Sequence, residues 1–336
     1  MIDSRVSIIT INYNGISDTI ECINSLKRIN YTNYEIFVVD NHSKNNEAYR
    51  LKKEFGDYIR LIKSNKNVGF SGGNNLAIRQ VIKEKKSQYI LLINNDTVIK
   101  ENALNLLVKK ASSNSKYGSI SPKILQYYHK DKVDSLGINY YKCGINTSIN
   151  NDLNKDMEPI GNITTAMGAC VLYNVEALKK ISYKSEVFDE EFFLYSEEVD
   201  LGFRIIHSGF IPVYEENAIV YHKGGSTSGG STSDLSRFYQ NRNNLLTIYK
   251  NYSVYNLVIY IIPIFIIQIG TFCLYIKRKK LKLIMRAYVS FIRLLSVESK
   301  KRRFIVKNSE ISSREFRYYL NKQIFPLRFI IDIIKK

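Results

Sequence analysis

Short runs of aliphatic and β-branched residues alternate with amphipathic stretches along the first third of this 336-residue chain. Apolar runs typical of buried strands occupy residues 6–11, 35–39, 59–62 and 89–93. Between them, apolar residues recur at helical spacing over residues 16–26, 51–55 and 76–82. This alternation predicts an α/β fold in which helices sandwich a mostly parallel sheet.

The pattern is less regular further along. Residues 121–160 are polar, and we expect loops with weak strands there. Residues 166–173, 211–214 and 218–221 are predicted as strands, and residues 175–181 as a short helix. A helix over residues 197–208 would turn Val199, Phe203 and Ile206 inward. The Gly/Ser-rich stretch at residues 224–233 is typical of a flexible loop.

Polar residues and glycines gather where the first four predicted strands end. In chain order they are Thr10, Asn12, Tyr13, Asp40, Asn67, Gly69, Gly72, Gly73, Asn74, Asn95 and Asp96. Because a parallel sheet binds ligands at the carboxyl ends of its strands, this edge is the candidate site. The glycines after the third strand let backbone N–H groups approach an anion at a helix N-terminus, although a tight turn with a helix cap explains them equally simply.

Carboxylates occur in two places that suit catalysis or metal binding. Asp96 follows a buried strand and is well placed to hold Mg²⁺ or Mn²⁺, while an Asn-Asn-Asp sequence also forms ordinary turns. Glu197, Glu198 and Asp200 begin a predicted helix beside large apolar residues, which raise carboxyl pKa values and suit a general base. The alternative is an acidic first turn that complements the helix dipole, with Ser196 as N-cap.

Two cationic candidates follow these acids. His222 ends a predicted strand just before the Gly/Ser-rich stretch, and it either serves the structure or contacts a metal or phosphate. Arg204 lies on the same predicted helix as Glu198 and either neutralises a phosphate or pairs with a neighbouring acid.

The distribution of charge separates the two ends of the chain. The formal net charge is +18, and residues 277–336 contribute +14 of it through 18 Lys/Arg against 4 Asp/Glu. Residues 251–276 carry no charge, and residues 257–276 are long enough to cross a bilayer of about 30 Å. Pro263, Gln268 and Gly270 disfavour a simple span, so a re-entrant or interfacial hairpin is an equal alternative. The basic, aromatic segment that follows is typical of membrane-surface helices.

The four cysteines have no C-x-x-C spacing, and the first residues do not form a signal peptide, so we expect a reducing, cytoplasmic location. Neither G-x-G-x-x-G nor a P-loop sequence occurs. A basic nucleic-acid-binding protein is a competing hypothesis, but the uncharged run inside the basic part disfavours it and we expect no nucleic acid as partner.

Taken in order, these motifs resemble family 2 glycosyltransferases with a GT-A fold, and among them the rhamnosyltransferase-like branch. The matching segments are residues 8–14, 38–41, 67–75, 92–96, 192–204 and 222–226. The resemblance implies a catalytic domain over residues 1–240 and a helical, membrane-associated tail over residues 241–336.

The resemblance also assigns roles to the candidate residues. Thr10, Asn12 and Tyr13 would line the nucleotide pocket, and Asp40 would bind the uracil or thymine. The residues Asn67, Gly69, Gly72, Gly73, Asn74, Asn95 and Arg204 would bind the rest of the nucleotide sugar. Asp96 and His222 would hold the metal, Mg²⁺ or Mn²⁺. Glu198 would be the general base, with Glu197 or Asp200 sharing that role.

The implied activity is inverting transfer of a sugar from a nucleotide-diphosphate donor, dTDP-L-rhamnose first and a UDP-hexose next. The acceptor would be a glycan or a polyprenyl-linked saccharide at the cytoplasmic side of the cell membrane. Because Asn94 replaces the first carboxylate of the family's D-x-D motif and Glu198 replaces an aspartate, a non-catalytic adaptor that binds a nucleotide sugar stays open as the alternative.

Overall fold

The computed structural model describes residues 4–150, 163–224 and 233–326, so most of the predicted Gly/Ser loop lies outside the described residues. The strands are β1 Val6–Asn12, β2 Tyr34–Asp40, β3 Ile59–Lys63, β4 Tyr89–Ile93, β5 Thr97–Ile99, β6 Tyr117–Gln126, β7 Val133–Ser135, β8 Ile138–Tyr140, β9 Asn146–Ser148, β10 Cys170–Asn174 and β11 Ile211–His222. The helices are α1 Ile16–Leu26, α2 Glu47–Phe55, α3 Gly69–Glu84, α4 Ala103–Ser112, α5 Val175–Ile181, α6 Glu197–His207, α7 Asp234–Asn251, α8 Val254–Lys277, α9 Leu281–Lys307 and α10 Ser313–Phe316. Short 3₁₀ turns occur at Gly56–Tyr58, Glu190–Phe192 and Arg317–Tyr319.

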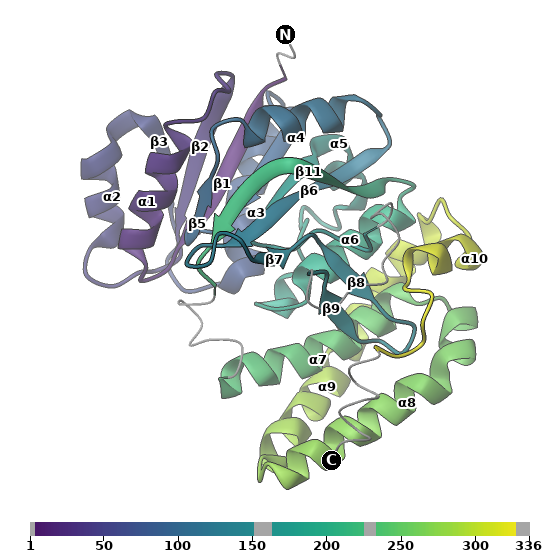
Figure 1. Ribbon diagram of the computed structural model, residues 1–336. Helices are drawn as coiled ribbons and strands as arrows, with labels where there is room; N and C mark the ends of the chain where they lie inside the picture. Colours follow the sequence, from purple (N-terminus) through teal and green to yellow (C-terminus); the bar gives the residue numbers. More distant parts are fainter. Residues whose placement is uncertain (1–3, 151–162, 225–232, 327–336) are drawn as a thin grey trace.

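A mainly parallel, curled sheet forms the centre of the molecule (Figure 1). Its strand order is β3-β2-β1-β4-β10-β6-β11-β5, with β7 paired to β6. The first four strands of this order run parallel, as do β6 and β11, whereas β10 runs antiparallel between β4 and β6. The expected α/β fold and the four expected N-terminal strands are therefore confirmed.

Helices cover both faces of the sheet because alternate residues of each central strand point to opposite sides. Ile8 packs with α1, α2 and α4 on one face, and Ile9 packs with α3, α5 and α6 on the other. The carboxyl ends of β1, β2 and β4 meet at one edge, where the register places Asn12 opposite Asp40. That edge carries the candidate site.

The ten-residue strand β6 begins at Tyr117 and runs into residues 121–160, where loops with weak strands were expected, and the short strands β7, β8 and β9 follow it. β6 escaped notice because Ser119 and Ser121 occupy buried positions that apolar residues normally fill. The two short strands expected over residues 211–221 form one strand, β11, whose register with β6 shifts between Glu215 and Ile219.

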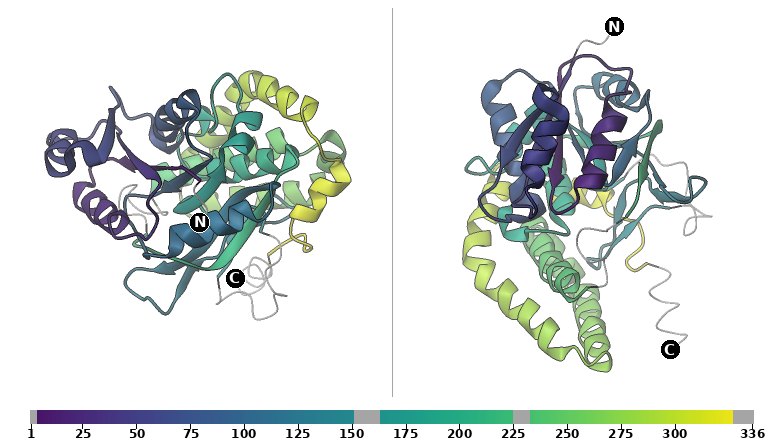
Figure 2. Two further views of the ribbon diagram at one scale, coloured as in Figure 1. Left: turned by 90° about the horizontal axis from the view of Figure 1, so that it is seen from above. Right: turned by 90° about the vertical axis from the view of Figure 1, so that its left-hand side faces the viewer.

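The C-terminal helices pack against the sheet domain. A shared core joins Tyr140 of β8 and Phe203 of α6 to Tyr252, Tyr260 and Phe316 of the C-terminal segment. The proposed domain boundary at residue 240 falls inside α7, which packs on both α6 and α9. In the right-hand view of Figure 2, α8 and α9 project from the sheet domain as a helical hairpin.

Helix α8 is long and apolar enough to cross a membrane, with a mean hydropathy of 2.4 and 17% of that stretch buried. One stripe, Asn256, Tyr260, Ile264 and Ile267, is buried against the rest of the molecule. The opposite face exposes apolar side chains, which are Val254, Tyr255, Val258, Ile259, Ile261, Ile262, Phe265, Ile266, Ile269 and Ile276.

Candidate active site

The buried amide of Asn12 organises the carboxyl ends of β1 and β2. Its Nδ2 donates to Asp40 Oδ2 at 3.0 Å and to Glu47 Oε2 at 2.9 Å, and its Oδ1 accepts from Thr19 Oγ1 at 2.7 Å. Asp40 Oδ1 also accepts from the backbone N–H of Ser43 at 3.1 Å. Asn12 is fully buried, so it fixes the orientation of Asp40 and does not line an open pocket itself.

Two other predicted ligands support α1 instead of facing an open surface. Thr10 is buried beside Cys22, and Asn95 Nδ2 donates to Thr19 Oγ1 at 3.1 Å and to Gly15 O at 3.4 Å. The N-terminal end of α1 covers these side chains, which explains the difference from the sequence expectation. Tyr13, by contrast, is half-buried at the end of β1.

Asn41, the residue after β2, holds the turn that opens α3. Its Nδ2 donates to Asn67 Oδ1 at 3.0 Å and to Gly69 O at 3.1 Å, while its Oδ1 accepts from Val68 N at 3.0 Å. Asn67 Oδ1 in turn accepts from Gly69 N at 2.8 Å. These bonds bring the end of β2 and the start of α3 together, as the sequence predicted for Asp40, Asn67 and Gly69.

The remaining residues of the glycine-rich motif lie inside α3 and not in a loop. A Cβ on Gly72 would meet Val68 Cβ at 2.7 Å, and a Cβ on Gly73 would meet Ile11 Cδ1 at 2.8 Å. Asn74 is buried and donates to Phe70 O at 3.0 Å within the helix. Gly73 therefore allows close packing of α3 on β1, and Gly72 leaves room for Val68 at the N-cap of α3. Both glycines lie within the helix and not in the turn that the sequence predicted to bind phosphate.

The loop over residues 192–196 connects the start of α3 to the start of α6. Gly69 has a φ of +72°, and a Cβ there would lie 2.3 Å from Phe193 O. Ser71 N donates to the same carbonyl oxygen at 3.2 Å. The start of α3 thus contacts the loop that leads directly into the acidic residues of α6.

Glu197 and Glu198 occupy the first turn of α6. Burial raises the pKa of both carboxyl groups, and the neighbouring Glu198 carboxylate raises that of Glu197 further. Glu197 is buried with Oε2 lacking a hydrogen bond, whereas Glu198 is half-buried. Glu198 Cβ lies 3.7 Å from the position of a Cβ on Gly168. A half-buried carboxylate with a raised pKa suits a general base.

Asp96 lies on the same edge as Glu198. The two are connected through Gly168 and Ala169, because Ala169 O accepts from Asn94 N at 2.9 Å. Asp96 is buried, its Oδ1 lacks a hydrogen bond, and His222 Nε2 lies 3.4 Å from that oxygen. The structure thus brings together the two residues that were predicted to share a metal ion.

Asp134 of β7 fixes His222 from its other side, with Oδ2 2.8 Å from His222 Nδ1. Burial opposes the charged imidazolium, but the carboxylates of Asp134 and Asp96 raise the pKa of His222 to about 9. His222 Nε2 faces Asp96 Oδ1, so it can bind a metal that Asp96 also holds only after the imidazolium has lost its proton. No three His, Cys, Asp or Glu side chains converge on a metal position within residues 4–150, 163–224 and 233–326. Asp96 and His222 therefore fit a divalent ion that takes further oxygen ligands from a bound diphosphate.

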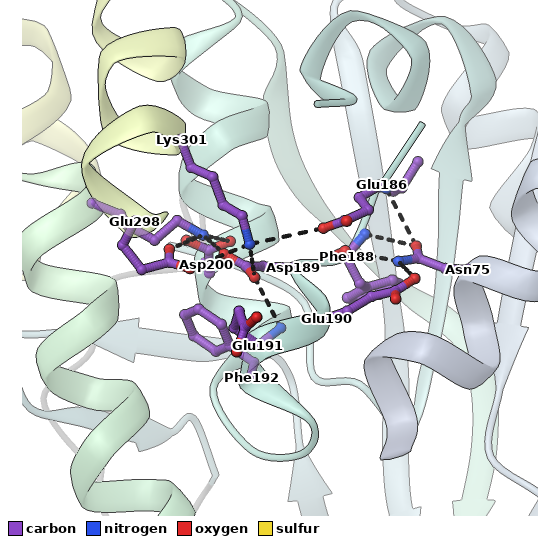
Figure 3. Close-up of polar contacts among 12 residues, drawn as sticks. Asn75, Glu186, Phe188, Asp189, Glu190, Glu191, Phe192, Asp200, Glu298 and Lys301 are labelled. Carbon is purple, nitrogen blue, oxygen red and sulfur yellow. Dashed lines mark hydrogen bonds and ion pairs between the residues drawn. The ribbon is translucent and has the colours of Figure 1, made fainter. Parts of the chain in front are cut away.

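Asp200 lies elsewhere, in a buried ion cluster between α6, α7 and α9 (Figure 3), and Arg204 pairs with it there. We define this buried ion cluster by its members Asp189, Asp200, Arg204, Lys250, Glu298 and Lys301. Asp200 is fully buried, accepts from Arg204 Nε at 2.8 Å and lies 3.0 Å from Lys250 Nζ. Burial favours its neutral form, but Lys250 and Arg204 hold the pKa of Asp200 below its usual range. Neither a shared base role for Asp200 nor a diphosphate contact by Arg204 agrees with this placement.

Several residues of the site region escaped the sequence analysis. Asn41 and Asp134 orient predicted ligands, while Asn243 and Lys250 of α7 contact the segment before α6. Asp134 lay in a segment expected to be irregular, and the α7 residues belonged to the expected tail. Asn41 directly follows Asp40 at the end of β2, and this position was the available signal.

Comparison with known proteins agrees with this geometry. The model of glycosyl transferase family 2 matches residues 7–182. The low-salt glycan biosynthesis hexosyltransferase Agl10 of Haloferax volcanii is 28% identical over 203 residues, which cover 59% of this chain and 61% of that protein. An N-acetylglucosaminyl-diphospho-decaprenol L-rhamnosyltransferase of Mycobacterium tuberculosis is 34% identical over 74 residues, 22% of this chain and 23% of that protein.

A solved structure shows the same fold. The mannosyltransferase PcManGT of Pyrobaculum calidifontis, in complex with GDP-Man and Mn²⁺, superposes with a TM-score of 0.54 at 12% identity. The superposition covers 93% of this chain and 85% of that one. The GT-A type of sheet, the motif order along the chain and the family match over residues 7–182 lead to one assignment: this chain belongs to glycosyl transferase family 2.

Proposed function

We propose that the protein is an inverting glycosyltransferase that moves a sugar from a nucleotide diphosphate to an acceptor hydroxyl. The observation that carries this proposal is the half-buried Glu198, with its raised pKa, on the same sheet edge as Asp96. The likeness to a hexosyltransferase and to a rhamnosyltransferase supports sugar transfer, with dTDP-L-rhamnose as first donor and UDP-hexoses next.

In this mechanism Glu198 takes the proton from the acceptor hydroxyl. The acceptor oxygen forms a bond to the anomeric carbon while the bond from that carbon to the diphosphate oxygen breaks on the opposite face, so the configuration inverts. Asp96 and His222 would hold Mg²⁺ or Mn²⁺, which when bound neutralises charge on the departing diphosphate. Asp40, fixed by Asn12, would bind the nucleotide base, and burial raises the pKa of the Glu198 carboxyl group, as a general base requires.

Substitution at Glu198 tests the assignment. Glu198→Gln removes the proton acceptor and keeps the shape, so transfer should fall by about 10²–10⁴-fold. Nucleotide binding, measured by thermal shift with UDP, dTDP and GDP with and without Mn²⁺, should persist. Ser113→Ala, at the exposed end of α4, serves as the unaffected control. Wild-type turnover in Glu198→Gln would contradict the base role, and a folded protein that no nucleotide stabilises would contradict the transferase.

We further propose that the α8–α9 hairpin holds the enzyme on the cytoplasmic face of a membrane that presents a lipid-linked acceptor. The exposed apolar face of α8 and the basic turn at residues 277–280 complement acyl chains and anionic headgroups. The stripe that includes Tyr260 and Ile264 is packed on the catalytic half. A helix packed in this way is not free to cross the bilayer, so we favour a hairpin that lies in one leaflet.

Vesicle binding tests the hairpin. Ile262 and Phe265 are 69% and 62% exposed, so Ile262→Asp with Phe265→Asp should abolish flotation with phosphatidylglycerol vesicles and leave the melting temperature unchanged. Replacement of the exposed Tyr49 by Asp, on α2, is the matched control. Undiminished flotation of the double variant would refute the surface. The exposed Cys273 reports topology, because a hairpin in one leaflet leaves it unreachable from the far side of a sealed vesicle.

A further inference from the structure

The loop that leads into the acidic helix has an unusual backbone. Phe193, Tyr195 and Ser196 have φ values of +64°, +68° and +65°, a region that residues other than glycine seldom adopt. Ser196 occupies the N-cap position of α6 without a side-chain capping bond. Such a backbone persists where the surrounding structure holds it, and it commonly does so beside functional groups.

One side chain of α7 holds this loop. Asn243 is fully buried, and its Nδ2 donates to the carbonyl oxygens of Phe192, Leu194 and Tyr195 at 2.9, 2.9 and 2.7 Å. The amide is itself oriented, because Asn243 Oδ1 accepts from Arg242 Nε at 2.9 Å.

The same arginine adds a second point of attachment. Arg242 Nη2 donates to Phe192 O at 3.2 Å and also to Glu191 O. The guanidinium carbon lies 4.8 Å from the ring centre of Tyr239, which stacks on Phe193 at 5.2 Å. All these contacts come from α7, so this helix supplies the support that the loop backbone needs.

We propose that Asn243 is a positioning residue for the transfer reaction. By holding the loop before α6, it sets the orientation of the Glu198 side chain in the first turn of that helix. The inference rests on the proposed role of Glu198. The loop ends one residue before Glu197, so its carbonyl oxygens determine where the first turn of α6 begins. The amide of Asn243 is suited to this task because its NH₂ group faces three carbonyl oxygens that no apolar side chain could satisfy.

The test compares Asn243→Ala and Asn243→Asp with Asn244→Ala in the full-length chain. Aspartate keeps the volume and removes the donors, so it carries the test if the alanine variant fails to fold. Asn244 lies on the same helix and accepts from Tyr140 OH of β8 at 3.0 Å, so its loss perturbs α7 away from the loop. Hydrogen exchange of residues 192–196 and turnover with dTDP-L-rhamnose and the UDP-hexoses are measured for each, together with the Kd for dTDP and UDP in Mn²⁺.

Both Asn243 variants should exchange the loop amides at least tenfold faster and lower kcat by about 10²-fold, with Kd changed less than threefold. Asn244→Ala should leave exchange and kcat near wild type. Unchanged loop exchange would overturn the inference, and so would faster exchange with unchanged kcat. The two proposals can fail separately. Full turnover of Glu198→Gln would refute the proposed role of Glu198, whereas hydrogen exchange of the loop would still report whether Asn243 holds its backbone.

Discussion

Replacement of Lys250 by methionine tests the energetics of the buried ion cluster. Lys250 is 1% exposed, and its Nζ lies 3.0 Å from Asp200 Oδ1 and 3.5 Å from Glu298 Oε2, and it also pairs with Asp189. Removal of one partner from a buried ion pair costs about 3–5 kcal/mol, because the remaining charges stay out of water without a counter-charge.

The neighbours place the expected loss at the low end of that range. Lys301 still pairs with Asp189, and Arg204 still pairs with Asp200. Burial raises the pKa of Glu298 to about 7, so this carboxyl group can take a proton when the cation is lost. Methionine keeps most of the side-chain volume. We therefore expect Lys250→Met to lower the free energy of unfolding by about 3 kcal/mol at pH 7.

Urea unfolding measures this loss, with the exposed Lys300→Met as the control, for which we expect a change below about 0.5 kcal/mol. Lys250 lowers the pKa of Asp189 and Asp200 in the folded state. Their stabilisation is therefore complete above the unfolded aspartate pKa of about 3.9 and is lost as the pH falls below it. The difference between wild type and Lys250→Met should shrink below pH ~4. A loss under about 1 kcal/mol at pH 7, or a difference independent of pH, would refute this account.

Three further predictions follow from the site and its surroundings. Gly69→Ala should lower the free energy of unfolding in urea by about 1–3 kcal/mol, which is more than Gly56→Ala should. Both glycines have a positive φ, but only at Gly69 would a Cβ meet Phe193 O. Equal losses in the two variants would contradict the clash. Asp96→Asn should remove the Mn²⁺-dependent part of nucleotide stabilisation in thermal shift, and retention of it would exclude Asp96 as a ligand. Burial lowers the pKa of His207 to about 4, so its own contribution to the free energy of unfolding should fall by about 2 kcal/mol from pH 7.5 to 5 as the unfolded imidazole takes a proton. The difference in free energy of unfolding between wild type and His207→Asn, measured in urea at the two pH values, should change by that amount, and a constant difference would contradict the assignment.

The N-terminal half of the fold was predictable because its signals are local. Central parallel strands are buried on both faces, so β1, β2 and β4 appear as apolar runs whose polar ends mark the site edge. The strand β6 was not predictable in this way, because serines occupy its buried positions 119 and 121 and interrupt the apolar pattern. Backbone hydrogen bonds to β10 and β11 hold these residues in the sheet.

The site residues divide along the same line. Asp96 and Glu198 directly follow or begin an element, so the strand-end and helix-start patterns point to them. Asp200 was grouped with Glu198 by proximity along the chain, although residues two apart point to opposite sides of a helix. Its partner Lys250 lies 50 residues away, and Lys301 lies 112 residues from its own partner Asp189. The hydrophobic pattern contains no information on such pairings.

The contacts between the catalytic half and the last described residues have a consequence for biosynthesis. Thr164 Oγ1 donates to Tyr319 O at 2.6 Å, Asn321 N donates to Tyr140 O at 2.8 Å, and Phe316 packs on Phe203. A ribosome that adds about 5–20 residues per second needs roughly 10 s after residue 196 to reach these partners. During that interval the face of α6 that carries Val199 and Phe203 lacks the aromatic cover that Phe316 provides. A chain that ends before residue 316 would therefore leave part of the shared apolar core exposed, so the C-terminal segment belongs to the same folding unit as the sheet.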